Sequence, residues 1–97
     1  MTCMLIAEMR AKPGNVDKIR NFLSAELPKT RGYEGCLSVL VVQNQDDPNS
    51  IILLEHFATR GHYERYLKWR TDTGTLAAVV EMIDGPISFR FCNFFGV

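Results

Sequence analysis

Two histidines, His56 and His62, are the candidate general bases of this sequence. A neutral imidazole accepts a proton near neutral pH and could deprotonate a phenol. Arg90 interrupts a phenylalanine-rich segment, where its cation could stabilise the resulting phenolate or enolate. We therefore predict that His62, His56 and Arg90 are catalytic. The alternatives are a solvated His62, a hydrogen-bonded His56 at an interface, and an ion pair of Arg90 with Glu8 or Glu55.

The aromatic residues Tyr63, Tyr66 and Trp69 follow at close to helical spacing. Their rings could stack on a flat substrate while their polar atoms orient it, so we predict that they bind substrate. Packing in the core is the alternative for Tyr63 and Tyr66. Trp69 lies off their centre line and is the better candidate to line a pocket.

Other kinds of chemistry have no motif in this chain. It contains no G-x-G-x-x-G, no Walker loop, no H-E-x-x-H and no cluster of cysteines or histidines, so we expect no cofactor and no metal. Eleven basic residues balance eleven acidic ones without a block of like charge, which argues against nucleic acid and anionic membranes as partners. A small neutral molecule or a protein is the expected partner.

The length of 97 residues and the 46% hydrophobic content fit one domain over residues 1–97, with a small core that leaves apolar surface for a partner. The chain has three cysteines, Cys3, Cys36 and Cys92, and no C-x-x-C pair. Because an odd number cannot all pair in disulfides, we expect a cytoplasmic location. There is no basic leader and no apolar run near the roughly 18 residues of a membrane span, so we expect neither secretion nor membrane insertion.

Periodicity predicts the elements that must position these residues. Residues 4–12 alternate as a strand, and Asn15 can cap a following helix that Pro28 should kink or end. Residues 36–43 and 51–57 form a hairpin that is apolar on both faces. Glu55 and His56 point to opposite faces of this hairpin, so one of them faces a pocket or a dimer contact.

Thr59 can cap a second helix, with Glu64 and Lys68 as an i, i+4 pair on its wet side. Residues 71–75 interrupt that helix, a further helical run covers 76–83, and residues 87–95 alternate as a last strand. The order is β-α-β-β-α-β with the second helix broken, a ferredoxin-like α+β fold with a four-stranded antiparallel sheet. Because its helices cover one face only, the other face should pack on the sheet of a second copy.

The sequence resembles the antibiotic-biosynthesis monooxygenase family over nearly its whole length. The resemblance lies in Lys12-Pro13-Gly14 after the first strand, in Thr30-Arg31 with Glu34-Gly35-Cys36-Leu37-Ser38, in Asp46-Asp47-Pro48, in Leu54-Glu55-His56-Phe57, and in Gly85-Pro86. It implies a homodimer in which two ferredoxin-like sheets form an α/β barrel, with a pocket between the sheet and the helices of each subunit.

The activities of this family range from oxygen insertion without metal or flavin to haem opening and isomerisation. The haem-opening branch relies on an Asn, a Trp and a His, whereas Met9 and Tyr66 stand at the first two positions here, which argues against haem. Met9 joins the residues predicted to bind substrate. Many members also place a His just after the second helix, where this chain reads Trp69-Arg70-Thr71-Asp72-Thr73.

These observations predict a cofactor-independent monooxygenase that acts as a homodimer on a small aromatic or quinol-type molecule. A non-catalytic small-molecule-binding or stress-responsive dimer is the main alternative, and the missing histidine favours it. An isomerase that moves a proton on a carbonyl compound is a third hypothesis, which needs a base but no oxygen.

Overall fold

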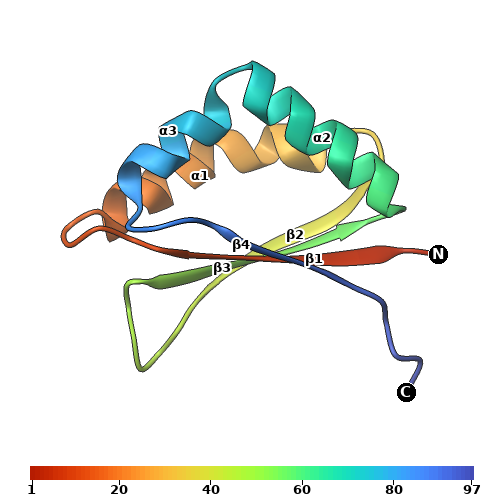
Figure 1. Cartoon of the computed structure of the whole chain (residues 1–97), viewed down its shortest axis with the longest axis horizontal. Coiled ribbons are helices and arrows are strands. Elements are labelled where there is room, and N and C mark those ends of the chain that lie inside the picture. The colour runs from red at the N-terminus through yellow and green to blue at the C-terminus, as the bar shows by residue number, and fades with distance from the viewer.

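A computed structural model describes the whole chain, residues 1–97. Four strands form one antiparallel sheet, and three helices lie together on one side of it (Figure 1). The elements in chain order are β1 (Cys3–Arg10), α1 (Val16–Arg31), β2 (Cys36–Gln43), β3 (Ser50–Phe57), α2 (Arg60–Asp72), α3 (Thr75–Met82) and β4 (Ser88–Cys92). The predicted ferredoxin-like fold is confirmed, with the second helix broken into α2 and α3.

The strands lie in the order β2-β3-β1-β4, so β2 and β4 are the two edges of the sheet. β1 pairs with β3 along its whole length and with β4 from Met4 to Glu8. The last strand is shorter than the predicted range 87–95 because Cys92 is the last residue with a partner on β1. The residues after Cys92 leave the sheet on the side away from the helices (Figure 1).

Strand alternation divides the sheet into an inner face under the helices and an outer face. On β1, Leu5, Ala7 and Met9 are buried on the inner face, whereas Ile6 and Glu8 point to the outer face and are only half-buried. The inner face and the buried sides of the helices form a single core cluster of 15 residues. Every long apolar side chain of that cluster removes surface from water, which is the main stabilisation available to so small a domain.

Helix α1 presents Ile19, Leu23 and Leu27 to the sheet at the spacing of one helical face. Pro28 lies in its last turn, and the helix continues through it to Arg31. The prediction that the Asn15 side chain caps α1 is wrong, because it accepts no hydrogen bond from the first turn of the helix. Its amide instead donates a hydrogen bond to the carbonyl of Met82, at 3.2 Å, and so ties the start of α1 to the end of α3.

Helix α2 begins with the predicted cap, because the Thr59 hydroxyl accepts a hydrogen bond from the backbone N–H of His62 at 3.1 Å. The break before α3 is made at Gly74, whose φ of +83° is unfavourable for other residues. The expected pair of Glu64 and Lys68 does not form. Glu64 pairs with Arg60 and Lys68 with Asp72, each at i, i+4 spacing.

The outer face of the sheet is open in the single chain. It presents apolar side chains from all three of the longer strands, among them Leu40 on β2, which is 61% exposed, and the half-buried Ile6 and Leu54. The predicted hairpin with two apolar faces is therefore present, but one chain buries only one of them. No helix in the structure has the length and apolar character needed to cross a membrane.

Candidate active site

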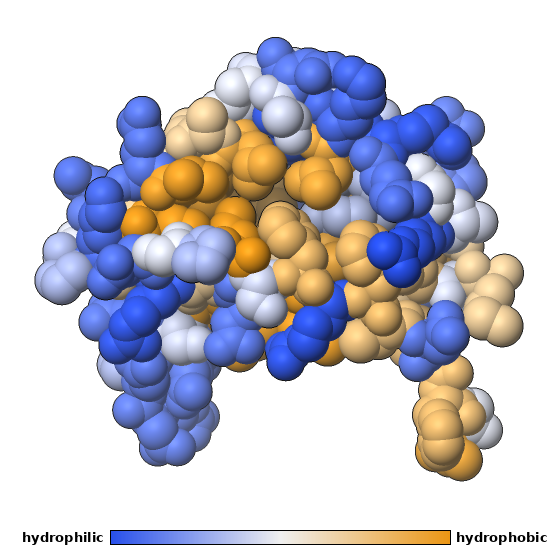
Figure 2. All heavy atoms as spheres, in the orientation of Figure 1, coloured by the Kyte–Doolittle hydropathy of each residue, from blue (hydrophilic) through white to orange (hydrophobic).

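A cavity of about 70 Å³ lies between the inner face of the sheet and the helices. Most of the side chains around it are apolar, and they come from β1, β3, β4 and all three helices. The least buried of its lining residues lie on α3 and on the edge strand β4 with the segment before it: Leu76 and Ile87 are half-buried, and Phe89 is 37% exposed. Figure 2 shows apolar surface gathered between the helices and the sheet, with a hollow at its centre. The fold therefore gives a molecule access to the core.

Glu55 is the one acidic side chain buried on the inner face, with 3% exposure. On the inner face of β3 it lies between Leu53 and Phe57, and it is paired with Leu5 of the neighbouring strand β1. Burial raises the pKa of Glu55 to about 7, and the charge of Arg70 only partly opposes this rise. Its carboxyl group therefore exchanges protons in the range where a general base is most useful.

Arg70, in the last turn of α2, is 5% exposed and connects α2 to α1. Its Nη2 donates to the Glu26 carbonyl at 2.8 Å and to the Thr30 hydroxyl at 2.9 Å, and its Nη1 lies 3.4 Å from the Glu26 carboxylate. Its Nε donates to the Tyr66 phenol oxygen at 3.0 Å. The buried cation is thus held by a carboxylate and three further oxygens, as a buried charge requires.

The hydroxyl groups of Thr30 and Tyr66 lie 2.7 Å apart, and either can donate to the other. Each oxygen already accepts a hydrogen bond from Arg70, which can only donate. The contact between the two hydroxyls uses one of their two protons. The other proton remains for a molecule in the cavity, which both residues line. Arg70 thereby prepares the pair as a hydrogen-bond donor.

Tyr63 and Tyr66 form the aromatic wall of the cavity together with Phe57, which contacts both of them at ring distances of 5.2 and 5.5 Å. Burial, reinforced by the nearby Glu55 carboxylate, raises the pKa of Tyr63 far above its usual value. Burial also raises the pKa of Tyr66, although hydrogen bonds from Thr30 and Arg70 oppose the rise. Both phenols therefore stay protonated at neutral pH and act as donors.

Three of the predicted substrate-binding residues, Met9, Tyr63 and Tyr66, come together around this cavity. Trp69 lies outside it and stacks on Tyr33, with 5.2 Å between ring centres and 21° between ring planes. The Arg70 guanidinium lies 4.5 Å from the centre of the Trp69 ring. Trp69 thus contacts Arg70, which lines the cavity, without lining the cavity itself.

The three residues predicted as catalytic lie apart from one another and outside the cavity. His56 stands on the outer face, where its ring packs on Phe94 at 4.9 Å and its Nε2 is buried without a hydrogen-bond partner. His62 lies at the start of α2, with its Nδ1 2.7 Å from the Thr59 hydroxyl. Arg90 is on the outer face and pairs with Glu8 at 3.4 Å, the ion pair considered as its alternative. A catalytic role for these residues stays a prediction.

His62 also has a packing role that the sequence did not indicate. Its ring lies directly against Gly35, where a Cβ atom would overlap it, and Gly35 has a φ of +89°. Glycine is required there on both grounds, because it alone combines this backbone conformation with the close approach. The turn before β2 and the start of α2 are thereby locked together.

Sequence reasoning missed Arg70, Thr30 and Glu26 as site residues. Arg70 shares a helical stripe with Tyr63 and Tyr66, which was a usable signal, because an arginine on a buried stripe needs acidic or carbonyl partners. Nothing in the sequence pairs it with α1, more than 40 residues earlier. A larger groove of about 390 Å³ between α1 and β2 holds no buried ionisable side chain and is not the candidate active site.

A ferredoxin-like sheet with an acid-bearing cavity under its helices defines the class of the protein: a small α+β domain with an internal ligand site. The family of antibiotic biosynthesis monooxygenases matches residues 2–71 of the sequence. The chain belongs to this family, whose members are typically dimeric.

Solved structures with the same fold span nearly the whole chain. A conserved protein of Methanosarcina mazei Go1 superposes with a TM-score of 0.87 at 18% identity, covering 95% of this chain and 91% of its own. A candidate antibiotic biosynthesis monooxygenase of Deinococcus radiodurans gives 0.84 at 18% identity over 98% and 94%. Another from Chloroflexus aurantiacus gives 0.80 at 24% identity over 100% and 96%. These likenesses show the fold. No curated protein matches the sequence.

Proposed function

We propose that this chain is a monooxygenase that takes a small aromatic or quinol-type molecule into the cavity and oxidises it with dioxygen, without a bound cofactor. The observation that carries the proposal is Glu55, a carboxyl buried in the cavity with a pKa of about 7, beside the phenols of Tyr63 and Tyr66. Membership in the monooxygenase family supports the reaction class.

Glu55 acts as the general base in this mechanism. At pH 7 about half of the protein molecules carry Glu55 in its ionised form. The apolar surroundings make this carboxylate a stronger base than it is in water. It takes the phenolic proton of the bound molecule. The hydroxyl proton of the Thr30–Tyr66 pair that is not used in their mutual hydrogen bond then stabilises the phenolate oxygen, with the Arg70 cation behind it.

The phenolate is electron-rich enough to react with dioxygen directly. One oxygen atom forms a new bond to a ring carbon, and the other leaves as water with two protons. The quinol supplies all four electrons that reduce dioxygen and is itself oxidised to a hydroxyquinone. The protein's part is to create the anion and to exclude bulk water from it.

The size of the cavity limits the substrate. Its volume of about 70 Å³ is smaller than the roughly 150 Å³ of an apolar cavity that admits benzene. A ring therefore enters beside Leu76 and Phe89, which are partly exposed and can move apart. A flat molecule of one ring fits this entry better than a fused ring system.

We also propose that the chain is a homodimer that joins the outer faces of two sheets, and that it works in the cytoplasm. The outer face supports this, because it exposes the apolar residues Leu40 and Val42. The buried His56 Nε2 lies on the same face and lacks a partner within one chain. The cytoplasmic location rests on the three cysteines, none of which forms a disulfide.

Oxygen consumption by metal-free protein with a panel of quinols tests the reaction. We expect uptake above background and a loss of at least about a hundredfold in Glu55→Gln. Glu64→Gln, an exposed carboxylate on α2, is the matched control. No uptake with any quinol would refute the monooxygenase. If His56→Ala or His62→Ala abolished uptake while Glu55→Gln did not, the base would lie at the histidine instead.

Two other functions would use the same cavity. An isomerase would turn over a carbonyl compound without oxygen and would still depend on Glu55, so anaerobic turnover identifies it. A non-catalytic binding protein would take up a quinol, seen as quenching of tyrosine and tryptophan fluorescence, without turnover in air. Glu55 favours the catalytic hypotheses, because binding alone does not require a buried carboxyl group with a raised pKa.

A further inference from the structure

Three side chains with nitrogen or sulfur donors lie in one row across the outer face of the sheet. Met4 on β1 is paired with His56 on β3 at one side and with Cys92 on β4 at the other. All three have outer-face parity, opposite to that of the buried Leu5. Directly opposed residues on neighbouring strands bring their Cβ atoms within about 4.5–5.5 Å of each other. An imidazole, a thioether and a thiol are therefore neighbours on the face that the cavity does not use.

The His56 ring reaches across this row. It packs on Phe94 with 4.9 Å between ring centres, and Phe94 follows the end of β4 at Cys92 by two residues. Since β1 lies between β3 and β4, the two rings meet over the strand that carries Met4. The Nε2 atom of His56 is buried there and has no hydrogen-bond partner. A buried ring nitrogen normally has a partner, so this one is free for a ligand that the chain itself does not supply.

The donor set selects the kind of metal. Thioether and thiolate sulfur are soft ligands, and together with an imidazole they suit Cu(I). Nowhere in the chain do three His, Cys, Asp or Glu side chains lie close enough to hold a metal ion, so Zn²⁺ would lack the ligands of its tetrahedral sites. Met4 supplies the third donor here, and a thioether prefers Cu(I) to harder divalent ions.

The spacing of the row fits a single ion. His56 and Cys92 stand two strands apart, about 10 Å at the backbone. The imidazole covers much of this distance and the shorter thiolate covers less, and metal bonds of about 2 Å to each close the remainder. Met4 lies between them, so its sulfur approaches the same point from the sheet. All three residues are half-buried, which leaves them accessible to an ion in the single chain.

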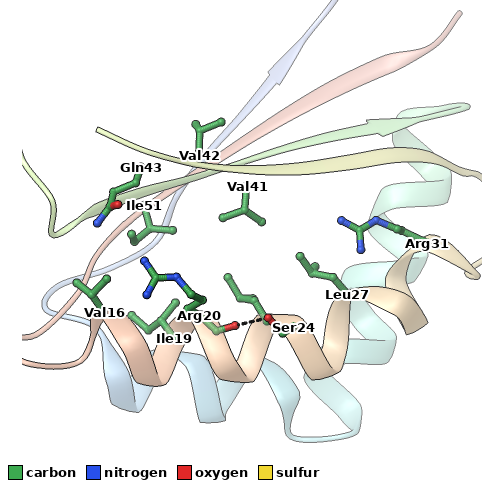
Figure 3. Close-up of a pocket in the computed structure, with 11 residues that line it drawn as sticks. Val16, Ile19, Arg20, Ser24, Leu27, Arg31, Val41, Val42, Gln43 and Ile51 are labelled. Atoms are coloured by element: carbon green, nitrogen blue, oxygen red, sulfur yellow. Dashed lines mark hydrogen bonds between the residues drawn. The ribbon is translucent and has the colours of Figure 1, made fainter. Parts of the chain in front are cut away.

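Neither of the two hollows described above offers such donors. The groove of about 390 Å³ between α1 and β2 contains no sulfur and no histidine, and its two arginines, Arg20 and Arg31, would repel a cation (Figure 3). The cavity under the helices contains one sulfur atom, that of Met9, and no histidine. A soft metal ion is therefore expected at the row on the outer face rather than in either hollow.

We propose that His56 Nε2, Met4 Sδ and Cys92 Sγ form a binding site for Cu(I). The Cys92 thiol releases its proton on binding, and no electron is transferred because the copper enters in its reduced state. The Phe94 ring beside His56 keeps water from one side of the ion. Because the donors come from three separate strands, no spacing in the sequence indicates them. The site is complete within one chain and rests on neither the proposed reaction nor the proposed dimer.

Competition for Cu(I) between the whole chain and the chelator bicinchoninate, under anaerobic reducing conditions, tests this proposal. We expect one copper per chain. Loss of a residue that only orients a metal ligand costs about ten- to a hundredfold in affinity, so loss of a ligand in Cys92→Ser or His56→Gln should cost more than about a hundredfold. Met4→Leu should cost at least about tenfold. Cys36→Ser and Met82→Leu, also at half-buried positions, are the matched controls and should bind as wild type.

X-ray absorption of the copper complex gives an independent measurement. We expect one nitrogen and two sulfur neighbours of the copper, and the loss of one sulfur in Met4→Leu. Equal weakening in Cys36→Ser and Cys92→Ser would show that copper binds to any accessible thiol and would overturn the site. Unchanged affinity in His56→Gln would refute the role of the buried Nε2 atom. Zn²⁺ that binds as tightly as Cu(I) would refute the choice of metal.

Discussion

Arg70 donates a hydrogen bond from Nε to the phenol oxygen of Tyr66, one helical turn earlier on α2, at 3.0 Å. The same guanidinium reaches back to α1 through Thr30 and Glu26. One side chain thus fixes the distance between two helices and orients a phenol at the cavity. Arg70 therefore both stabilises the packing of α2 on α1 and orients the hydroxyl groups of the site.

Replacing Arg70 by methionine should therefore cost stability as well as activity. The change leaves the hydroxyls of Thr30 and Tyr66 and the carbonyl of Glu26 without their buried donor. We expect the free energy of unfolding to fall by about 2–4 kcal/mol in urea titrations. Arg65→Met, an exposed residue of the same helix, should stay within about 0.5 kcal/mol of wild type. Equal effects of the two changes would contradict the role of the network.

Tyr66→Phe should separate hydrogen bonding from ring packing. The substitution keeps the aromatic contacts and removes the hydroxyl that lies between Thr30 and Arg70. We expect a loss of about 1–2 kcal/mol in thermal or urea unfolding. Tyr63→Phe is the matched control, because the Tyr63 hydroxyl takes no part in this network, and it should cost less. The opposite order would show that the network does not stabilise the fold.

Glu55→Gln should stabilise the protein in a pH-dependent manner. Burial raises the pKa of Glu55 to about 7 from 4.5, so between pH 4.5 and 7 the folded chain keeps a proton that the unfolded chain releases. Stability is lost as the pH rises through this window, and the loss is complete above pH 7. We expect Glu55→Gln to exceed wild type by about 3 kcal/mol at pH 8 and to lack this gain at pH 4. Unfolding at both pH values measures the difference.

The rate of oxygen uptake should report the same carboxyl group. A general base must be ionised, so kcat/KM should rise with pH through an apparent pKa of about 7. In Glu55→Asp, whose shorter side chain retracts the carboxylate, the rate should fall while a titration in this region remains. A rate that does not vary between pH 5.5 and 8.5 would remove Glu55 from the mechanism.

Leu40→Glu should dissociate the homodimer. Leu40 is 61% exposed on the outer face, where a charge is harmless in the monomer and costly when it is buried against a second sheet. We expect sedimentation velocity to show a species of 11.0 kDa. Val80→Glu, 49% exposed on α3, is the matched control and should keep the wild-type mass. Dimers of unchanged affinity in Leu40→Glu would place the contact elsewhere.

Most of the fold could be predicted from periodicity, but the choice between Glu55 and His56 could not. Both faces of the hairpin are apolar, so alternation alone does not say which face lies under the helices. The register with β1 decides it, because Glu55 stands opposite the buried Leu5 and His56 opposite Met4 on the outer face. The site's remaining partners come from α1, and no local pattern records contacts over such a separation.

The pairing of β1 with β4 has a consequence for the order in which the chain can fold. β1 is one of the two central strands and precedes the other elements, yet its neighbour β4 is completed only at Cys92. Until then a growing chain can form the helices and the β2–β3 hairpin, but the apolar inner face next to β1 stays uncovered. Long-range pairings of this kind slow folding, and nascent intermediates with a bare sheet edge tend to aggregate. The domain should therefore complete its sheet only after Cys92 has left the ribosome, and a chaperone that binds apolar segments should protect it until then.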